Sequence, residues 1–220
     1  MSSASPRLWS LGAGPGSASY EAFDAARRSL NRRLAARLLR RMEGAWSAAP
    51  RTLEAGSGPG YCSSILAAMK PEIRAALLDF DREPLAIAAA RDARIAAIQG
   101  DLYRIPFADG SFDLVFNSST MEHLDSFAPA LAEMVRVTRS GGKLFVGVPY
   151  RFGPFLPFNL VPARCSVADW MGTLFSRTEL VAACGAARVV VEETHRYFFG
   201  CFIGLLLSKE RRPDAAGHAV

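Results

Sequence analysis

Three alternate glycines, Gly56, Gly58 and Gly60, follow a short apolar run and precede a stretch with helical spacing. Ser57 lies between the first two glycines. Glycine has no Cβ and accepts positive φ, so a glycine-rich chain can turn sharply and lie against a ligand. Between a strand and a helix, such a loop stands where open α/β folds bind ligands. The segment therefore predicts a ligand-binding turn.

Acidic side chains end the three strands expected around this loop. Glu54 ends the strand before it and can accept hydrogen bonds from a ligand ammonium group. Asp79 ends the next strand, where a carboxylate can accept from both hydroxyls of a ribose. Asp101 follows the third strand and can accept from an adenine amino group, while Phe80 and Leu102 flank the two acids and can sandwich the adenine. These residues predict a nucleoside pocket with room for an amino acid.

The segments that must position these residues alternate between strand and helix patterns. We expect strands at 51–55, 75–79, 94–99, 112–118 and 143–148, and helices at 61–69, 83–91 and 126–138, the last ended by glycines 141–142. A helix at 176–184, opened by a capping box of Ser176 and Glu179, then precedes a hairpin of strands at 187–194 and 198–208. Strands joined by helices imply parallel pairing with right-handed crossovers. The sequence predicts a Rossmann-like, doubly wound α/β sheet.

The amino-terminal segment carries the excess charge of the chain. The net charge is +5, and the first 50 residues hold eight arginines against three acids. Apolar residues recur every four positions from Leu30 to Trp46, which predicts an amphipathic helix over 21–46. We favour a solvated arginine face on a helix that covers the ligand. Two alternatives stay open: contact of the 27–41 helix with an anionic membrane, its leucine stripe inserted, and contact with nucleic acid phosphates, which no binding module supports.

The composition bounds the remaining possibilities. Four scattered cysteines form no CxxC pair, so we expect a reducing, cytoplasmic setting, with peripheral membrane contact as an option, and no metal. No basic start followed by an apolar core marks a secretory signal. The expected organisation is a flexible tail at 1–19, a basic helical extension at 20–50, a catalytic domain at 51–208 with an aromatic insert at 151–175, and a polar tail at 209–220.

Four segments, taken in order, resemble the class I S-adenosylmethionine-dependent methyltransferases, in particular the methyltransferase-11 group. They are LEAGSGPG, LLDFDREPLAIA, QGDLYRIPFADGSFDLVFNSSTMEHL and RVTRSGGKLFVGVP, and the resemblance covers about residues 51–150. It implies S-adenosyl-L-methionine as cofactor and a seven-stranded sheet with an antiparallel last strand. It also implies that Gly56, Ser57 and Gly58 hold the methionine portion, which Asn117 would line.

By the same resemblance, Asp79 holds the ribose, and Asp101 with the Leu102 amide holds the adenine. His123 follows the fourth strand, and a neutral imidazole there can remove a proton from the methyl acceptor. The alternative is that His123 caps a turn or packs on the cofactor. An in-line methyl transfer needs little other side-chain chemistry, because the enzyme mainly aligns the reactants and excludes water.

Aromatic residues after the fifth strand favour a small, hydrophobic or lipid-like acceptor, although they can equally bury the insert on the domain. They are Tyr150, Phe152, Phe155, Phe158, Trp170 and Phe175. An NAD-dependent oxidoreductase is a poorer interpretation, because its G-x-G-x-x-G motif would need a glycine where Tyr61 stands. A non-catalytic protein that keeps the cofactor pocket and binds a membrane or a partner remains the second hypothesis. The oligomeric state is not readable from the sequence.

Overall fold

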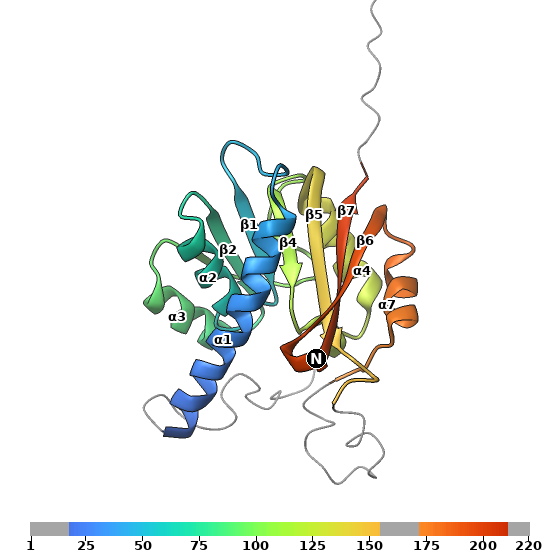
Figure 1. Ribbon diagram of the computed structural model, residues 1–220. Helices are drawn as coiled ribbons and strands as arrows, with labels where there is room; N and C mark the ends of the chain where they lie inside the picture. Colours follow the sequence, from blue (N-terminus) through green and yellow to red (C-terminus); the bar gives the residue numbers. More distant parts are fainter. Residues whose placement is uncertain (1–17, 155–171, 211–220) are drawn as a thin grey trace, which may run out of the picture.

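The computed structural model describes residues 18–154 and 172–210, which form a seven-stranded sheet in the order β3-β2-β1-β4-β5-β7-β6 (Figure 1). Strands β1 to β5 pair in parallel, whereas β7 runs antiparallel to both β5 and β6. The strands are β1 (Arg51–Ala55), β2 (Arg74–Asp79), β3 (Ala96–Gln99), β4 (Phe112–Asn117), β5 (Thr138–Pro149), β6 (Val189–Tyr197) and β7 (Phe202–Lys209). The predicted doubly wound fold with an antiparallel last strand is confirmed.

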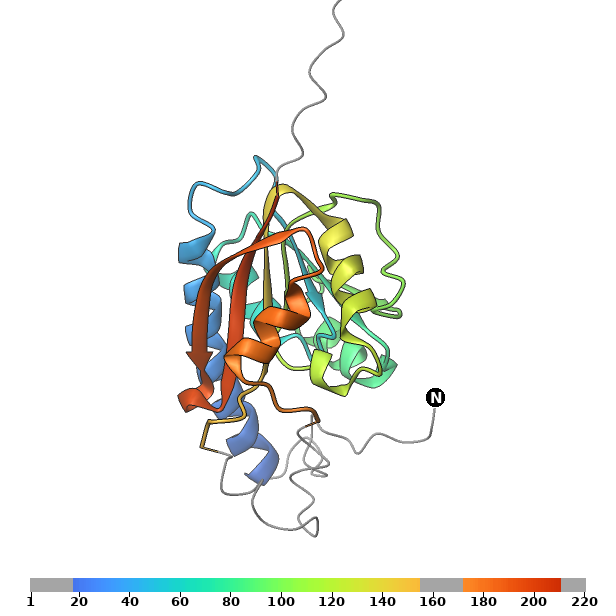
Figure 2. The same cartoon turned by 90° about the vertical axis from the view of Figure 1, so that its right-hand side faces the viewer.

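Helices cover both faces of this sheet and form two hydrophobic cores (Figures 1 and 2). Helices α1 (Ala18–Arg41), α2 (Tyr61–Met69) and α3 (Arg82–Arg91) contribute the buried residues of one core. Helices α4 (Phe127–Val137) and α7 (Arg177–Cys184) contribute those of the other. A short 3₁₀ turn, η1 (Met121–His123), follows β4, and a second, η2 (Phe198–Gly200), joins β6 to β7. Within the described ranges, none of the helices has the length and apolarity that crossing a bilayer requires.

The apolar side of α1 belongs to the protein core. Leu34, Leu38 and Met42 are at most 2% exposed and pack with residues of α2 and the sheet. On the neighbouring side, Arg37 and Arg41 both pair with Glu193 of β6. The alternative in which the leucine stripe enters a membrane is therefore wrong, because the fold already buries that stripe. The helix also ends at Arg41 rather than at residue 46.

We expect Leu38→Ala to lower the free energy of unfolding by about 2–5 kcal/mol, because it leaves a cavity in the core under α1. Arg40→Ala removes an exposed side chain of the same helix and should change stability by less than about 0.5 kcal/mol. Urea denaturation of both variants gives the comparison. Equal midpoints for Leu38→Ala and the unmodified chain would show that α1 does not dock in solution.

The carboxyl end of α4 differs from the prediction. The helix ends at Val137 and passes directly into β5, so Gly141 and Gly142 lie inside the strand instead of ending the helix. The Lys209 ammonium of β7 donates to the carbonyl oxygens of Arg136 and Thr138, at 3.3 and 2.5 Å. A side chain from another strand thus satisfies the carbonyls that a glycine cap would otherwise serve.

The carboxyl-terminal part follows the prediction with shifted boundaries. The Ser176 side chain accepts from the backbone N–H of Glu179, and the Glu179 carboxylate accepts from Ser176 N–H, which confirms the capping box. The predicted hairpin is present, but β7 begins at Phe202 rather than at residue 198, because residues 198–200 form η2. Of the aromatic insert, Phe155, Phe158 and Trp170 lie outside the described residues.

Candidate functional site

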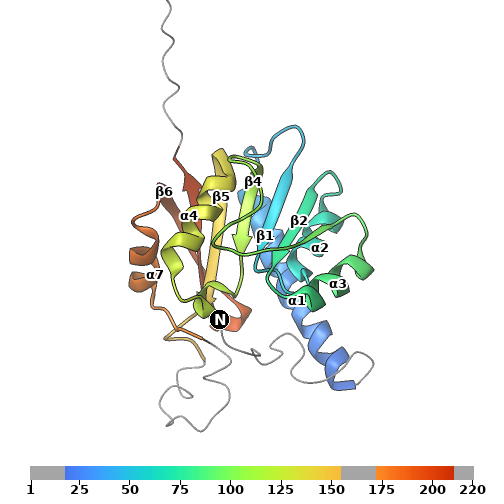
Figure 3. The same cartoon turned by 180° about the vertical axis from the view of Figure 1, so that it is seen from behind.

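The candidate site lies at the carboxyl ends of β1, β2 and β4 (Figure 3). Strands β1 and β4 are neighbours, yet α2, which follows β1, and α4, which follows β4, contribute to cores on opposite faces of the sheet. The connections therefore diverge between these two strands, which makes their carboxyl ends the topological switch point of the sheet. In open α/β sheets this switch point is where ligands bind.

Three glycines in left-handed conformations shape the loop between β1 and α2. Gly56, Gly58 and Gly60 have φ values of 72°, 51° and 65°. The N–H groups of Gly56 and Ser57 donate to the Leu78 carbonyl oxygen of β2, at 2.7 and 3.0 Å. A Cβ on Gly60 would overlap a buried leucine, whereas a Cβ on Gly58 would meet nothing within 4 Å. The backbone at Gly58 is therefore open to a ligand.

Asp79 at the end of β2 faces this loop. Its Oδ2 accepts from the N–H of Gly58 at 2.6 Å, and its Oδ1 accepts from the N–H of Asp81 at 2.9 Å. Burial raises the pKa of the Asp79 carboxyl above its ordinary value, although these backbone donors oppose the shift. Carboxylate oxygens have about four lone-pair sites, so both retain acceptor capacity. The neighbouring Phe80 side chain is 66% exposed.

Asp101 lies beside the end of β2, because the N–H of Gly100 donates to the backbone oxygen of Asp79 at 2.9 Å. One oxygen of Asp101 accepts from the N–H of Tyr103 at 2.9 Å and closes a tight turn. The Leu102 side chain is only 7% exposed and packs in the core covered by α4. The structure thus places one exposed hydrophobic side chain, Phe80, beside the two acids, where the sequence predicted two.

Glu54 and Asn117 are buried beneath the loop. Glu54 Oε2 accepts from the N–H of Ser63 at 3.0 Å and ties β1 to the first turn of α2. Asn117 at the end of β4 donates to the Ala55 carbonyl oxygen and accepts from the N–H of Met121 at 3.4 Å. Glu54 therefore holds β1 to α2, Asn117 holds β4 to β1, and contact of either side chain with a ligand stays a prediction.

Burial raises the pKa of Glu54 to about 7 and that of Glu122 also to about 7, against an ordinary value of 4.5. The unfolded chain ionises these acids near pH 4.5, while the folded chain keeps them neutral up to about 7. Their contribution to stability is therefore full below pH 4.5 and is lost as the pH rises toward 7, by on the order of 3 kcal/mol per group.

We expect Glu54→Gln to remove one of these two losses, because glutamine keeps an acceptor for Ser63 but does not ionise. The measurement is the urea unfolding free energy between pH 4.5 and pH 8. Glu72→Gln is the control, since the Glu72 side chain is 66% exposed. A Glu54→Gln profile parallel to that of the unmodified chain would contradict the pKa assignment.

Tertiary contacts to the loop that sequence reasoning missed come from Thr120 and α1. Thr120 Oγ1 donates to the Gly56 carbonyl oxygen at 2.8 Å, and a Cβ on Gly56 would lie 2.5 Å from the Thr120 methyl group. Asp24 of α1 accepts from the Tyr61 hydroxyl, immediately after the loop. Asp24 stands seven residues before Asn31 and fourteen before Leu38, all buried on one face, so its heptad spacing was an available signal.

His123 and Glu122 lie in η1, after β4. Burial lowers the pKa of His123, whose side chain is 31% exposed. Its Nε2 lies 3.9 Å from Glu122 Oε1, which accepts from the Ser119 hydroxyl at 2.5 Å. Glu122 Oε2 is buried and has no hydrogen-bond partner within the described part of the chain. The imidazole is therefore neutral near pH 7 and can accept a proton.

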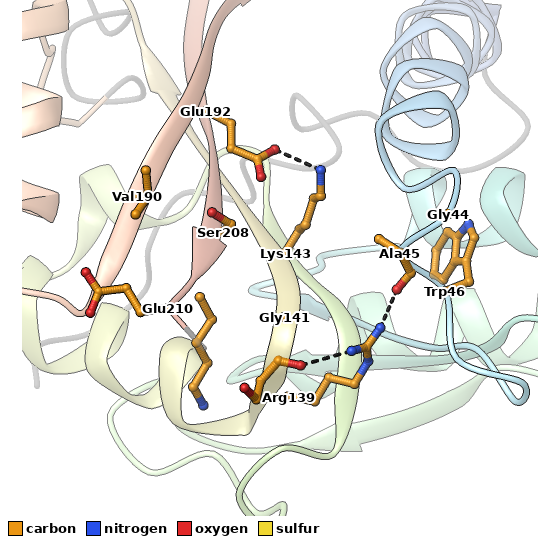
Figure 4. A pocket seen from close by; sticks show the side chains of 12 residues that line it. Gly44, Ala45, Trp46, Arg139, Gly141, Lys143, Val190, Glu192, Ser208 and Glu210 are labelled. Carbon is orange, nitrogen blue, oxygen red and sulfur yellow. Dashed lines mark hydrogen bonds and ion pairs between the residues drawn. The ribbon is translucent and has the colours of Figure 1, made fainter. Parts of the chain in front are cut away.

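A hollow of about 810 Å³ lies at the opposite end of the strands, where β5 begins (Figure 4). Its cations already have protein partners: Lys143 pairs with Glu192 at 2.8 Å, and Arg139 pairs with Asp113 at 2.7 Å. Its position at the amino-terminal ends of the parallel strands is not where α/β sheets bind ligands. We therefore assign the chemistry to the glycine loop at the carboxyl ends of the parallel strands.

Comparisons with known proteins agree with this geometry. Residues 53–146 match a family model described as a methyltransferase domain, of the methyltransferase-11 group. A probable S-adenosylmethionine-dependent methyltransferase of Mycobacterium tuberculosis is 33% identical over 139 residues, which cover 60% of this chain and 50% of that protein. A demethylmenaquinone methyltransferase of Renibacterium salmoninarum is 39% identical over 107 residues, which cover 48% and 44%. The chain spans about half the length of the curated relatives it matches.

The fold has solved counterparts. The crystal structure of an S-adenosylmethionine-dependent methyltransferase of Thermotoga maritima, a possible histamine N-methyltransferase, superimposes with a TM-score of 0.65. It is 21% identical, and the match covers 87% of this chain and 95% of that one. Residues 53–146 therefore form a domain of the class I S-adenosylmethionine-dependent methyltransferases, methyltransferase-11 group. S-adenosyl-L-methionine is the methyl donor that this membership implies.

Proposed function

We propose that this chain transfers a methyl group from S-adenosyl-L-methionine to a small, hydrophobic or lipid-like acceptor. The observation that carries the proposal is the open backbone at Gly58 beside the Asp79 carboxylate, at the switch point between β1 and β4. The carboxyl groups of Asp79 and Asp101 can accept hydrogen bonds from a ligand that carries hydroxyl and amino groups. The residues present thus fit this cofactor.

In this proposal the glycine loop and the residues at the strand ends each have a role in binding the cofactor. Gly56, Ser57, Gly58 and Gly60 lie against the methionine portion, and Asp79 accepts from the ribose hydroxyls. Asp101 and the Leu102 amide hold the adenine edge, and the exposed Phe80 ring covers its face. Glu54 and Asn117 act from below, by holding the ends of β1 and β4 around the cofactor.

When bound, S-adenosylmethionine supplies an electrophilic methyl group on a sulfonium, which is already an excellent leaving group. The protein therefore has to align the acceptor and keep water away. His123 can take a proton from an acceptor hydroxyl or carbon acid, because its imidazole is neutral near pH 7 and partly exposed.

We expect His123→Ala to lower kcat about 10²–10⁴-fold without changing the affinity for S-adenosylhomocysteine. Activity of the unmodified chain should fall on the acid side of pH 6.5, where the imidazole becomes protonated, since burial lowers its pKa below that value. His195→Ala, which removes the half-buried histidine stacked on Tyr197, is the control. A kcat within threefold of the unmodified chain would assign His123 to packing.

Support for the acceptor class comes from the end of β5 and from one relative. Tyr150 is buried, Phe175 packs on Phe127 with ring centroids 5.8 Å apart, and Phe152 is exposed. The relative from Renibacterium salmoninarum is named for a quinone acceptor. Aromatic surroundings and this similarity favour an apolar acceptor over a charged one.

Two measurements test the proposal. Calorimetry with S-adenosylhomocysteine should show binding to one site. Incubation with methyl-labelled S-adenosylmethionine and the lipid and aqueous fractions of a cell lysate should label a compound in the lipid fraction. Binding without labelling of any fraction would favour the non-catalytic hypothesis, and labelling only in the aqueous fraction would overturn the acceptor class.

A further inference from the structure

Two exposed phenylalanines lie on adjacent loops at the carboxyl ends of the parallel strands, the end that also holds the candidate site. Phe152 follows β5 and is 59% exposed, and Phe199 in η2 is 77% exposed. The N–H of Tyr150 donates to the Cys201 carbonyl oxygen at 2.8 Å, and a Cβ on Gly153 would lie 2.6 Å from a backbone oxygen of the η2 turn. The two loops therefore touch each other. Large apolar side chains exposed on adjoining loops are typical of interaction sites.

The backbone displays Phe199 at an energetic cost. Phe198 and Phe199 have φ values of 50° and 57°, in the left-handed region that aromatic residues rarely occupy. The Phe198 ring packs on Tyr197 and Phe202, with centroids 4.8 and 5.4 Å away, so burial explains its conformation. The Phe199 ring is 77% exposed, and the Arg33 guanidinium lies 5.8 Å from its centroid. Packing among the residues that the structure describes does not explain this left-handed backbone.

The charges around the two rings are positive. Arg33 and Arg196 are exposed, and within residues 18–154 and 172–210 neither has an ion pair with an acid. Arg196 lies over the Tyr150 ring at 4.8 Å and donates to its hydroxyl. In contrast, Arg37 and Arg41 of α1 share the single carboxylate of Glu193. Arg33 and Arg196 therefore place positive charge beside the exposed rings.

We propose that Phe152 and Phe199 enter the headgroup region of an anionic lipid bilayer while Arg33 and Arg196 contact its phosphates. Apolar rings bordered by arginines match a surface that is apolar below and negatively charged above. Phe152 and Phe199, with Arg33 and Arg196, form the patch. The loops that carry the two rings lie at the carboxyl ends of the parallel strands, so a bound membrane would face the end of the sheet that holds the site (Figure 1). This inference goes beyond the proposed function, because membrane binding requires no methyl transfer.

The test is sedimentation of the full chain with phosphatidylcholine vesicles and with vesicles that also contain phosphatidylglycerol. The unmodified chain should bind only the anionic vesicles, and less as salt increases. The variant Phe152→Ser/Phe199→Asn should bind at least tenfold more weakly, and asparagine tolerates the left-handed turn, so the fold should persist. Arg33→Gln and Arg196→Gln should each weaken binding about fivefold.

The matched control is Met69→Gln/Val190→Thr, which removes two exposed apolar side chains from elsewhere on the molecule and should bind like the unmodified chain. Circular dichroism checks that each variant is folded, and Phe199→Asn alone replaces the double variant if that one is not. Failure of the unmodified chain to bind anionic vesicles, or equal binding by the aromatic variant, would overturn the proposal. So would a dimer that forms without vesicles and is lost in the aromatic variant, since the patch would then join two copies.

Discussion

Asp79→Ala should weaken the binding of S-adenosylhomocysteine by roughly 1.5–3 kcal/mol, or about 10- to 150-fold, in calorimetry. The carboxylate sits at the end of β2 and already accepts from the N–H groups of Gly58 and Asp81. Its remaining lone pairs are the natural acceptors for two ribose hydroxyls, and a hydrogen bond to a charged group is stronger than one between neutral groups. Loss of the carboxylate leaves those hydroxyls without their partner.

The control for Asp79→Ala is Asp109→Ala, which removes a carboxylate that is 80% exposed before β4 and should leave affinity unchanged. A sharper version compares S-adenosylhomocysteine with its 2′-deoxy analogue in both backgrounds. The unmodified chain should discriminate between the two ligands, and Asp79→Ala should not, because the coupled contact is then absent. Equal discrimination in both backgrounds would remove Asp79 from the ribose site.

Gly58→Ala should abolish most cofactor binding while leaving the chain folded. A Cβ at Gly58 meets no protein atom within 4 Å, so the methyl group enters the space that we assign to the ligand. The left-handed backbone, with φ of 51°, adds a strain of about 1–2 kcal/mol. We expect the Kd for S-adenosylhomocysteine to rise at least about tenfold, which corresponds to about 1.4 kcal/mol.

Gly44→Ala is the matched control for this substitution. Gly44 has φ of 73°, and a Cβ there also meets nothing within 4 Å. Gly44, however, lies between α1 and β1, at the amino-terminal end of the parallel strands. Both variants should therefore lose a similar unfolding free energy in urea, whereas only Gly58→Ala should lose binding. Similar affinities for the two variants would show that the open space at Gly58 is not part of the cofactor site.

Much of the fold was predictable because its signals are local. The alternation of strand and helix patterns between residues 51 and 149, the glycine loop and the acids at the strand ends are set by neighbouring residues and by the chirality of crossovers. The capping box at Ser176 is equally local, and the structure contains it. Parallel strands place their carboxyl ends at one edge, so the convergence of Asp79, Asp101 and the loop followed from order alone.

Contacts between distant parts of the chain carried no such signal. The bond from Lys209 to the end of α4 spans 71 residues, and it replaced the glycine stop expected there. The Thr120–Gly56 bond spans 64 residues and the Tyr61–Asp24 bond spans 37, and neither pair shares a local motif. Whether Leu102 is buried, or Phe199 exposed, depends on which helix or turn packs beside it.

The sequence by itself therefore determined the type of sheet, the turn at its edge and the chemical character of the groups that end its strands. Only the tertiary structure decided which of those groups stay accessible, which ones are buried as ties between strand and helix, and that the leucine stripe of α1 belongs to the core. The physical reason is that hydrogen bonding and backbone preference act between near neighbours, whereas burial depends on the whole packed chain.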